Sequence, residues 1–231
     1  MIKALLIDID NTILDFDAYV REGMKSGFQK FGLPPYEDYM YNVFWEINSK
    51  MWHGIEQGTF TYEELLKTRW NTVFAALGFS FDGVMFEKYF KGCLFDSAIP
   101  IDGAYELLDY LKARYPLYVA SNGAYAQQIN RLTKSNMMGN FKGLFISEKV
   151  GASKPAPEFF EHCIKEISGD LGEDLHPTEL MIIGDSLSSD IRGAIDLGIK
   201  TCYFDRYAKG NGAELPITHR VTSLSEIKDF L

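Results

Sequence analysis

Short apolar runs alternate with amphipathic segments along most of the chain, and together they predict an α/β fold. Residues 3–9 (KALLIDI) form an apolar run that ends in acids, as expected of a buried strand that leads into a loop. Further buried strands are predicted at residues 117–120, 144–147, 180–183 and 200–204. Strands separated by helical segments indicate a doubly wound parallel sheet with right-handed crossovers.

The segments between these strands have the spacing of helices. Apolar residues recur at the i, i+3, i+4 and i+7 positions of one predicted amphipathic helix, namely Ala104, Leu107, Leu108 and Leu111. Gly198 follows residues 189–197, at the place where a glycine commonly ends a helix, just before the last predicted strand.

Residues 15–95 differ from the rest of the chain. Their periodicity is helical, they contain no buried-strand run, and they lie between the first predicted strand and the remainder of the sheet. We therefore expect an α-helical cap domain, 15–95, inserted into a Rossmann-like core formed by residues 1–14 and 96–231. The hinges are expected near 14–17 and 96–100.

The composition and net charge of the chain limit the kinds of molecule that it is expected to bind. The 231-residue chain is 46% hydrophobic and has a net charge of −9, which favours a folded protein and disfavours binding to a nucleic acid polymer. A small phosphorylated substrate is compatible with this charge if cations neutralise it at the site. No apolar stretch approaches the ~20 residues that span a bilayer, and the three cysteines are scattered. We expect a cytoplasmic protein without a membrane partner.

The first candidate site is the Asp8-x-Asp10-x-Thr12 sequence at the end of the first predicted strand. Residues i and i+2 of an extended chain point to the same side, so both carboxylates would face one site. One carboxylate can attack phosphorus, and the other can carry protons. Taken alone, the motif is equally compatible with a solvated acidic turn.

Two further loops carry groups that suit a phosphate. Ser121 and Asn122 directly follow the strand at 117–120 and offer a hydroxyl and an amide. The tripeptide Ser121-Asn122-Gly123 is also common in ordinary turns. Lys154 precedes Pro155, which favours a loop at a helix start, and its alternative is an ordinary surface lysine.

The fourth loop brings two more carboxylates. Asp185 follows the strand at 180–183, and Asp190 is expected in the first turn of the next helix, where it could simply stabilise the helix dipole. Ser186 could cap the same helix. Because the carboxyl ends of parallel strands meet in one crevice, these acids would gather with Asp8 and repel one another unless a cation joined them. Mg²⁺ suits such an all-oxygen site.

The order DxDxT, Ser-Asn, Lys-Pro and GDxxxxD resembles the haloacid dehalogenase (HAD) superfamily of phosphatases along the whole predicted core. The resemblance implies that Asp8 is the nucleophile and Asp10 the acid/base. It implies that Mg²⁺ is held by Asp8, Asp185 and the backbone carbonyl of Asp10. Phosphate would be bound by Ser121, Asn122 and Lys154, and Asp190 would support the metal shell or Lys154.

A narrower similarity lies in the predicted cap. Residues 51–61 (MWHGIEQGTFT) with Arg69, and residues 146–151, resemble bacterial pyrimidine 5′-nucleotidases of the same superfamily. This implies hydrolysis of nucleoside monophosphates. The cap residues that would contact a substrate are Trp52, His53, Gln57 and Arg69. The cap's aromatic residues could stack on a base, but helical aromatics commonly form a bundle core instead.

Several functions remain open. Dehalogenases of the superfamily lack the second carboxylate of the first motif, so Asp10 argues against that activity. Phosphoglycolate or a sugar phosphate is an alternative substrate, and a phosphomutase would use the same four motifs. A non-catalytic relative would normally have lost Asp8, Asp10 or Lys154. The sequence does not indicate an oligomeric state.

Overall fold

The computed structural model of the protein describes residues 1–231, and the chain divides into two compact units. The sheet unit comprises Met1–Asp15 and Ala98–Leu231, and the helical unit comprises Phe16–Ser97. The boundaries expected after residues 14 and 95 lie one and two residues from this division.

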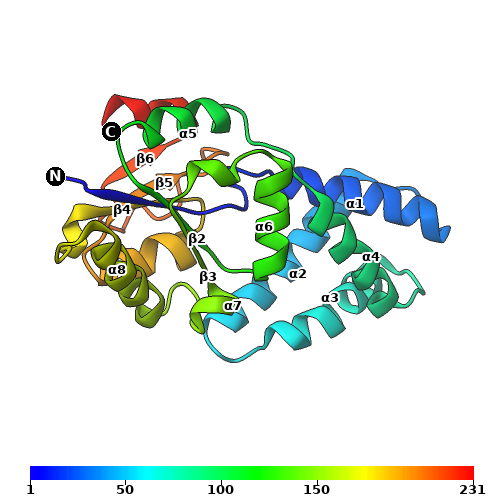
Figure 1. The fold of residues 1–231 in the computed structure, drawn as a ribbon. Helices are drawn as coiled ribbons and strands as arrows, with labels where there is room; N and C mark the ends of the chain where they lie inside the picture. The colour runs from blue at the N-terminus through cyan, green and yellow to red at the C-terminus, as the bar shows by residue number, and fades with distance from the viewer. The chain divides into compact units, whose positions relative to one another are not determined.

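Six parallel strands form the sheet, in the order β3-β2-β1-β4-β5-β6 (Figure 1). Their bounds are β1 Ala4–Ile7, β2 Leu117–Ser121, β3 Gly143–Ile146, β4 Leu180–Gly184, β5 Lys200–Phe204 and β6 His219–Val221. All five predicted strands are confirmed, as is the doubly wound parallel arrangement. The short edge strand β6 was not predicted, because His219 and Arg220 interrupt any apolar run.

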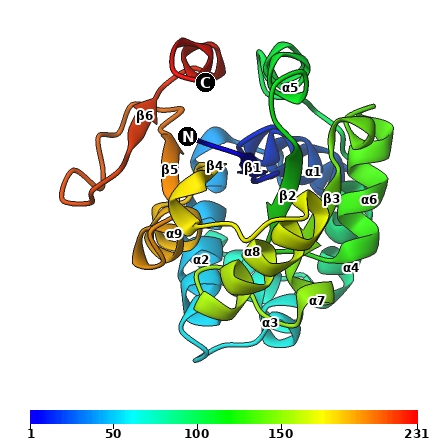
Figure 2. The same ribbon diagram turned by 60° about the vertical axis from the view of Figure 1, so that its left-hand side comes forward.

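Helices cover both faces of this sheet. Helix α5 and the C-terminal 3₁₀ segment lie on one face, and α8 and α9 lie on the other (Figure 2). The helical elements are α5 Ala104–Lys112, α6 Tyr125–Lys134, 3₁₀ Met138–Asn140, α7 Ser147–Val150, α8 Pro157–Leu171, 3₁₀ Pro177–Glu179, π Leu187–Arg192, α9 Gly193–Asp196 and 3₁₀ Leu224–Asp229. Pro157 occupies the first turn of α8, where its missing N–H costs nothing.

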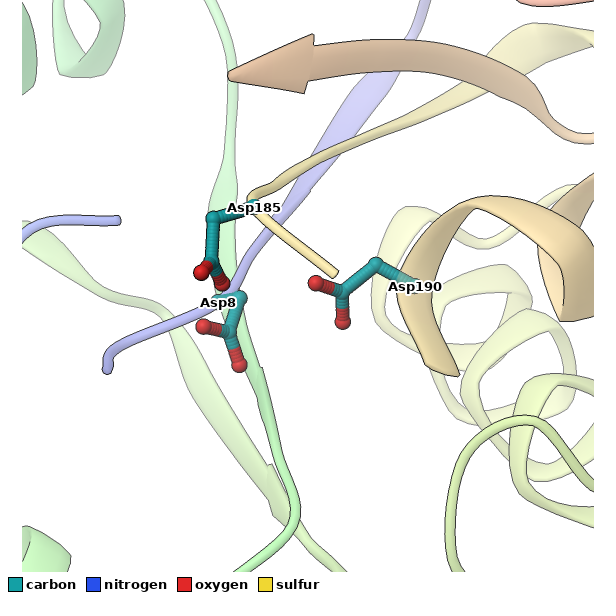
Figure 3. A group of neighbouring side chains, drawn as sticks. All are labelled: Asp8, Asp185 and Asp190. Atoms are coloured by element: carbon teal, nitrogen blue, oxygen red, sulfur yellow. The ribbon is translucent and has the colours of Figure 1, made fainter. Parts of the chain in front are cut away.

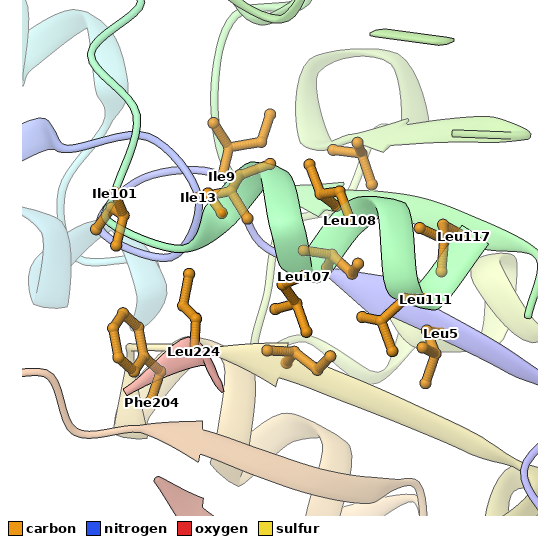
Figure 4. Packing of buried hydrophobic residues seen from close by; sticks show 14 of the residues in the cluster. Leu5, Ile9, Ile13, Ile101, Leu107, Leu108, Leu111, Leu117, Phe204 and Leu224 are labelled. Carbon is orange, nitrogen blue, oxygen red and sulfur yellow. The ribbon is translucent and has the colours of Figure 1, made fainter. Parts of the chain in front are cut away.

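The alternation of side chains along β1 supplies two cores. Leu5 packs with the cluster on the α5 side, while Leu6 packs with the cluster under α8. The predicted apolar stripe of α5, which includes Leu107 and Leu111, packs in the same cluster as Leu5 and Leu117 (Figure 4). Each such fully buried leucine stabilises the fold by about 1.5–3 kcal/mol. This packing fixes the strands whose ends carry the polar loops.

The helical unit is a bundle of four helices, α1 Phe16–Phe31, α2 Asp38–Glu56, α3 Tyr62–Leu77 and α4 Gly83–Asp96. Its core is largely aromatic: Phe28, Phe44, Trp70, Phe74, Phe86 and Phe90 are buried and in ring contact with one another. The aromatic surplus of this segment therefore serves mainly to pack the bundle. Neither unit contains a helix that combines the length and the apolar character needed to cross a membrane.

Candidate active site

The predicted polar loops meet at the carboxyl ends of the central strands. Asp8 directly follows β1, Ser121 ends β2, and Asp185 directly follows β4. Strand β1 pairs with β2 on one side and with β4 on the other, so the strand order reverses beside it. Crevices at such reversals are where open α/β sheets bind ligands.

Three carboxylates gather at this reversal. Oxygens of Asp8, Asp185 and Asp190 lie within 4.8 Å of one another, and Figure 3 shows the three side chains converging from two strand ends and a helix. Asp8 is 6% exposed and Asp190 is fully buried. The Asp8 backbone N–H donates to the carbonyl of Ile183 at 3.0 Å, which extends the β1–β4 pairing to the nucleophile candidate itself.

Lys154 is the cation of this cluster. Its Nζ donates to Asp8 Oδ1 at 2.8 Å, to Asp190 Oδ1 at 2.6 Å and to the carbonyl of Ala120 at 2.6 Å. Its side chain is 1% exposed, so the alternative of an ordinary surface lysine is wrong. Asp190 also accepts a hydrogen bond from the N–H of Ser186 at 3.0 Å, so each of its two oxygens has a protein donor.

The charges of this cluster do not cancel. Burial, aided by the Asp190 carboxylate and opposed by the Lys154 ammonium, raises the pKa of Asp8 from 3.8 to about 7. Burial alone lowers the pKa of Lys154, but Asp190 and Asp8 outweigh it and raise that pKa above its ordinary value. Lys154 therefore stays charged, and Asp8 and Asp190 share its single positive charge, which leaves the cluster with surplus negative charge.

A hard cation would neutralise the surplus negative charge of this cluster. The donors on offer are carboxylate oxygens, without nitrogen or sulfur ligands, and this set suits Mg²⁺. Asp190 has one oxygen engaged by Lys154 and the other by the backbone N–H of Ser186, so Asp8 and Asp185 are the side chains that would hold the ion. Bound there, Mg²⁺ would supply positive charge for a phosphate oxygen and for the ionised form of Asp8.

Asn122 has a different position from the one expected of a phosphate ligand. Its side-chain Oδ1 accepts from the backbone N–H of Lys154 at 2.9 Å, and its Nδ2 donates to the carbonyl of Lys154 at 2.7 Å. The amide therefore fixes the backbone that carries Lys154. The Ser121 side chain is buried at the end of β2, where Gln128 Nε2 donates to its Oγ at 2.9 Å.

The second carboxylate of the first motif has partners that sequence reasoning missed. Asp10 accepts from Arg131 Nη1 at 2.7 Å and from Gln128 Nε2 at 2.9 Å, both on helix α6. Gln128 and Arg131 are 1% and 0% exposed. The sequence feature that could have indicated these two residues is their i, i+3 spacing on the helix after Ser121. Glutamine and arginine side chains on a helix are usually solvated, so this spacing alone does not predict contact with Asp10.

Gly184 leaves room for the cluster. A Cβ atom at this position would lie 2.3 Å from Asp190 Oδ2, which is far inside van der Waals contact. The glycine that precedes Asp185 thus allows the carboxylate of Asp190 to approach the end of β4. This close approach explains in physical terms why a residue without a side chain stands before the acid.

The candidates in the helical unit divide into two groups. Trp52, His53 and Gln57 lie at the end of α2, where the His53 ring contacts Gln57 Nε2 at 2.9 Å, and all three remain at least partly exposed. Trp52 is in ring contact with Tyr62, with centroids 5.9 Å apart. These side chains are accessible on the surface of the helical unit.

Arg69 does not share that exposure. It forms a bidentate ion pair with Glu87, with N–O distances of 3.1 and 2.6 Å, and donates to Asn48 Oδ1 at 2.9 Å. Arg69 and Glu87 are 6% and 4% exposed. The expectation that Arg69 contacts a substrate is corrected by these contacts, which assign its guanidinium to the interior of the bundle.

Known proteins resemble the chain over its whole length. The family model for haloacid dehalogenase-like hydrolases matches residues 2–198. The pyrimidine 5′-nucleotidase PynA of Streptococcus pneumoniae is 32% identical, and the alignment covers 99% of this chain and 94% of that protein. The pyrimidine 5′-nucleotidase YjjG of Escherichia coli is 23% identical, with coverage of 98% and 96%.

A solved structure agrees with the fold. The HAD-hydrolase YfnB of Bacillus subtilis, described as bound to magnesium and as revealing interdomain movement, superposes with a TM-score of 0.89 at 31% identity. The match covers 100% of this chain and 98% of the YfnB chain.

Proposed function

Because the chain belongs to the haloacid dehalogenase-like hydrolases, we propose that it is a Mg²⁺-dependent phosphomonoesterase that passes the phosphoryl group through Asp8. The observation that carries this proposal is the buried cluster of Asp8, Asp185 and Asp190 around Lys154. It combines surplus negative charge, a permanent cation and three carboxylate groups close enough together to hold a metal ion at the carboxyl end of β1.

The reaction has two halves. An Asp8 oxygen attacks phosphorus, the bond from phosphorus to the ester oxygen breaks, and Asp10 gives that oxygen a proton. Asp10 then takes a proton from water, whose oxygen attacks phosphorus and displaces the Asp8 carboxylate as inorganic phosphate leaves. Lys154 and Ser121 hold the phosphoryl oxygens through both steps, and Asp190 keeps Lys154 in place.

For the substrate we propose nucleoside 5′-monophosphates, with pyrimidines preferred. The support is the naming of PynA and YjjG as pyrimidine 5′-nucleotidases, at 32% and 23% identity over nearly the full chain. Within the helical unit, Trp52, His53 and Gln57 offer an aromatic face and hydrogen-bonding groups that suit a base. We propose that this unit is a cap that closes over the substrate and excludes water.

One assay tests the reaction class and the substrate. Phosphate release is measured for UMP, CMP, AMP, phosphoglycolate and glucose 6-phosphate, with Mg²⁺ and with excess EDTA. We expect turnover only with Mg²⁺ and the highest kcat/KM for UMP or CMP. Full turnover in EDTA would overturn the metal role, and preference for phosphoglycolate or the hexose phosphate would overturn the substrate. Release that stops at one enzyme equivalent would indicate a mutase.

A second assay tests the cap residues. The change Gln57→Ala or His53→Ala should lower kcat/KM for UMP while leaving kcat/KM for p-nitrophenyl phosphate, which has no base, nearly unchanged. Lys50→Ala, an exposed residue on the same helix that pairs with Glu46, is the control. Equal losses on both substrates would contradict recognition of the base by this surface.

A further inference from the structure

A chain of buried hydrogen bonds links helix α6 to both halves of the site. Arg131 Nη1 donates to Gln128 Oε1 at 2.9 Å and to Asp10 Oδ1 at 2.7 Å. Gln128 Nε2 in turn donates to Asp10 Oδ2 and to Ser121 Oγ, each at 2.9 Å. One helix thus touches the proposed proton carrier and the proposed phosphate ligand through two side chains.

The direction of these hydrogen bonds follows from their chemistry. A guanidinium can only donate, so the Gln128 atom that meets Arg131 must be the carbonyl oxygen. The amide nitrogen of Gln128 then faces Asp10 and Ser121 and can only donate to them. Because the Ser121 oxygen accepts there, its own proton is free to point elsewhere. Arg131 therefore determines, through Gln128, that Ser121 can offer a proton to a phosphate oxygen.

The same contacts restrain Asp10. Each of its two carboxylate oxygens accepts from a different α6 side chain, so the plane of the carboxylate is fixed as well as its position. The Asp10 side chain is 30% exposed, while the Arg131 side chain is 1% exposed. A carboxylate that is held by buried donors and still partly exposed is suited to exchange of a proton with a bound ligand.

We infer that Gln128 and Arg131 are positioning residues, which aim the Asp10 carboxylate at the leaving oxygen and the Ser121 hydroxyl at the phosphate. This inference rests on the proposed function, because it assigns these residues to the reaction of Asp10 and Ser121. Burial of two polar side chains on one helix face costs stability unless they are fully hydrogen-bonded. Here the hydrogen bonds go to the groups that would do the chemistry.

The inference separates two measurable effects. Misaiming Asp10 should slow esters whose leaving group needs a proton, such as UMP, more than p-nitrophenyl phosphate, whose leaving group hardly needs one. Turning the Ser121 hydroxyl away should weaken the binding of inorganic phosphate, which involves no leaving group. If the residue only packed the helix, its substitution would lower the melting temperature and would reduce kcat for all substrates by the same factor.

The experiment uses the full chain with Mg²⁺ and four variants. Arg131→Met keeps the length of the side chain but removes its donors, Arg131→Lys restores one donor, and Gln128→Leu removes the amide. Gln127→Leu is the matched control, since Gln127 is a buried glutamine of the same helix. Each variant is assayed with UMP and p-nitrophenyl phosphate, for inhibition by inorganic phosphate, and for its melting temperature.

We expect Arg131→Met to lose about 10- to 100-fold more kcat with UMP than with p-nitrophenyl phosphate, because a misaimed general acid should cost less than the roughly 10²–10⁴-fold of one that is removed. Arg131→Lys should recover part of this difference. Gln128→Leu should show the same bias and raise the inhibition constant of phosphate by about tenfold, as loss of one hydrogen bond to a charged group does. Gln127→Leu should show neither effect.

Two failures can be told apart. If the wild-type protein hydrolyses neither ester, the proposed function falls and this inference falls with it. If the wild type is active but the Arg131 and Gln128 variants lose equal factors on both esters, or match Gln127→Leu, the inference is wrong and the proposed function stands.

Discussion

Replacing Lys154 with methionine is the sharpest test of the charge arrangement in the site. The change preserves an unbranched side chain of similar length but removes the ammonium that Asp8 and Asp190 share. Both carboxylates are buried, at 6% and 0% exposure, so water cannot replace the lost partner. The variant should therefore lose stability as well as turnover.

The magnitude follows from the cost of a broken buried ion pair, about 3–5 kcal/mol. For a chain of this size a loss of 1 kcal/mol lowers the melting temperature by roughly 2–4 °C, so the expected drop is roughly 6–20 °C. The protein can reduce this cost by protonating Asp8, whose pKa is already raised to about 7 by burial. The full effect should therefore appear at pH 8 rather than at pH 6.

The assay is thermal unfolding of Lys154→Met and wild type at pH 8, in EDTA and then in excess Mg²⁺. Mg²⁺ should recover part of the lost stability, because a divalent cation beside Asp8 replaces the missing positive charge. Lys142→Met is the control: Lys142 lies on the surface of the same unit and donates to the carbonyl of Asp170 at 3.1 Å. It should change stability by no more than about 0.5 kcal/mol.

A melting temperature for Lys154→Met in EDTA that matches both wild type and Lys142→Met would refute this reasoning. It would mean that the Asp8 and Asp190 carboxylates do not depend on Lys154 for compensation. Turnover should be lost in Lys154→Met even when Mg²⁺ restores stability, since the phosphoryl oxygens then lack a ligand. Restored stability together with restored turnover would remove Lys154 from the proposed mechanism.

Four further outcomes are expected. Burial raises the pKa of Asp8 from 3.8 to about 7. Between pH 3.8 and about pH 7 the metal-free folded protein therefore keeps a proton on Asp8 that the unfolded chain has released. The stability of the metal-free protein should fall as the pH rises through this range. Asp8→Asn should flatten this fall in melts at several pH values, and parallel curves for both proteins would contradict the assignment. Asp10→Asn should keep about 10⁻² to 10⁻⁴ of wild-type turnover and accumulate acid-trapped phosphoenzyme with p-nitrophenyl phosphate; trapping it in Asp8→Asn instead would reverse the roles. Gly184→Ala places a methyl group 2.3 Å from Asp190 Oδ2, so activity should be lost, and an unaffected kcat would show that the end of β4 can shift. Arg69→Lys should lower the melting temperature without changing kcat/KM for p-nitrophenyl phosphate, and a selective loss of UMP hydrolysis would return Arg69 to the substrate site.

The sheet and the cluster at the carboxyl ends of its central strands were predictable because local patterns specify them. An apolar run such as 180–183 followed by Gly-Asp carries both the strand and the place where its acid emerges. The parallel order of strands then brings Asp8 and Asp185 together without further information. The edge strand β6 escaped prediction because it is three residues long, contains two polar residues and pairs only with β5.

Tertiary partners were not predictable in the same way. The fate of Arg69 depends on Glu87, which is 18 residues away on another helix, and no local spacing connects the two. The role of Asn122 depends on the backbone of Lys154, 32 residues away. A family resemblance suggested that Arg69 contacts a ligand, and the side-chain amide suggested the same for Asn122, but the fold supplies protein partners for both side chains.

The first motif shows how the fold gives two nearby carboxylates different environments. Asp8 and Asp10 have the same chemistry and stand two residues apart, yet Asp8 is buried beside Lys154 while Asp10 is partly exposed and held by Arg131. Lys154 reaches Asp8 from the loop before α8, whereas Arg131 reaches Asp10 from α6. Carboxylates with such separate environments can act as nucleophile and as proton carrier in one reaction. The distinction lies in helix α6 and in the loop before α8. Substitutions on α6 should therefore change how strongly the rate depends on the leaving group's need for a proton, whereas substitution of Lys154 should lower turnover whatever the leaving group.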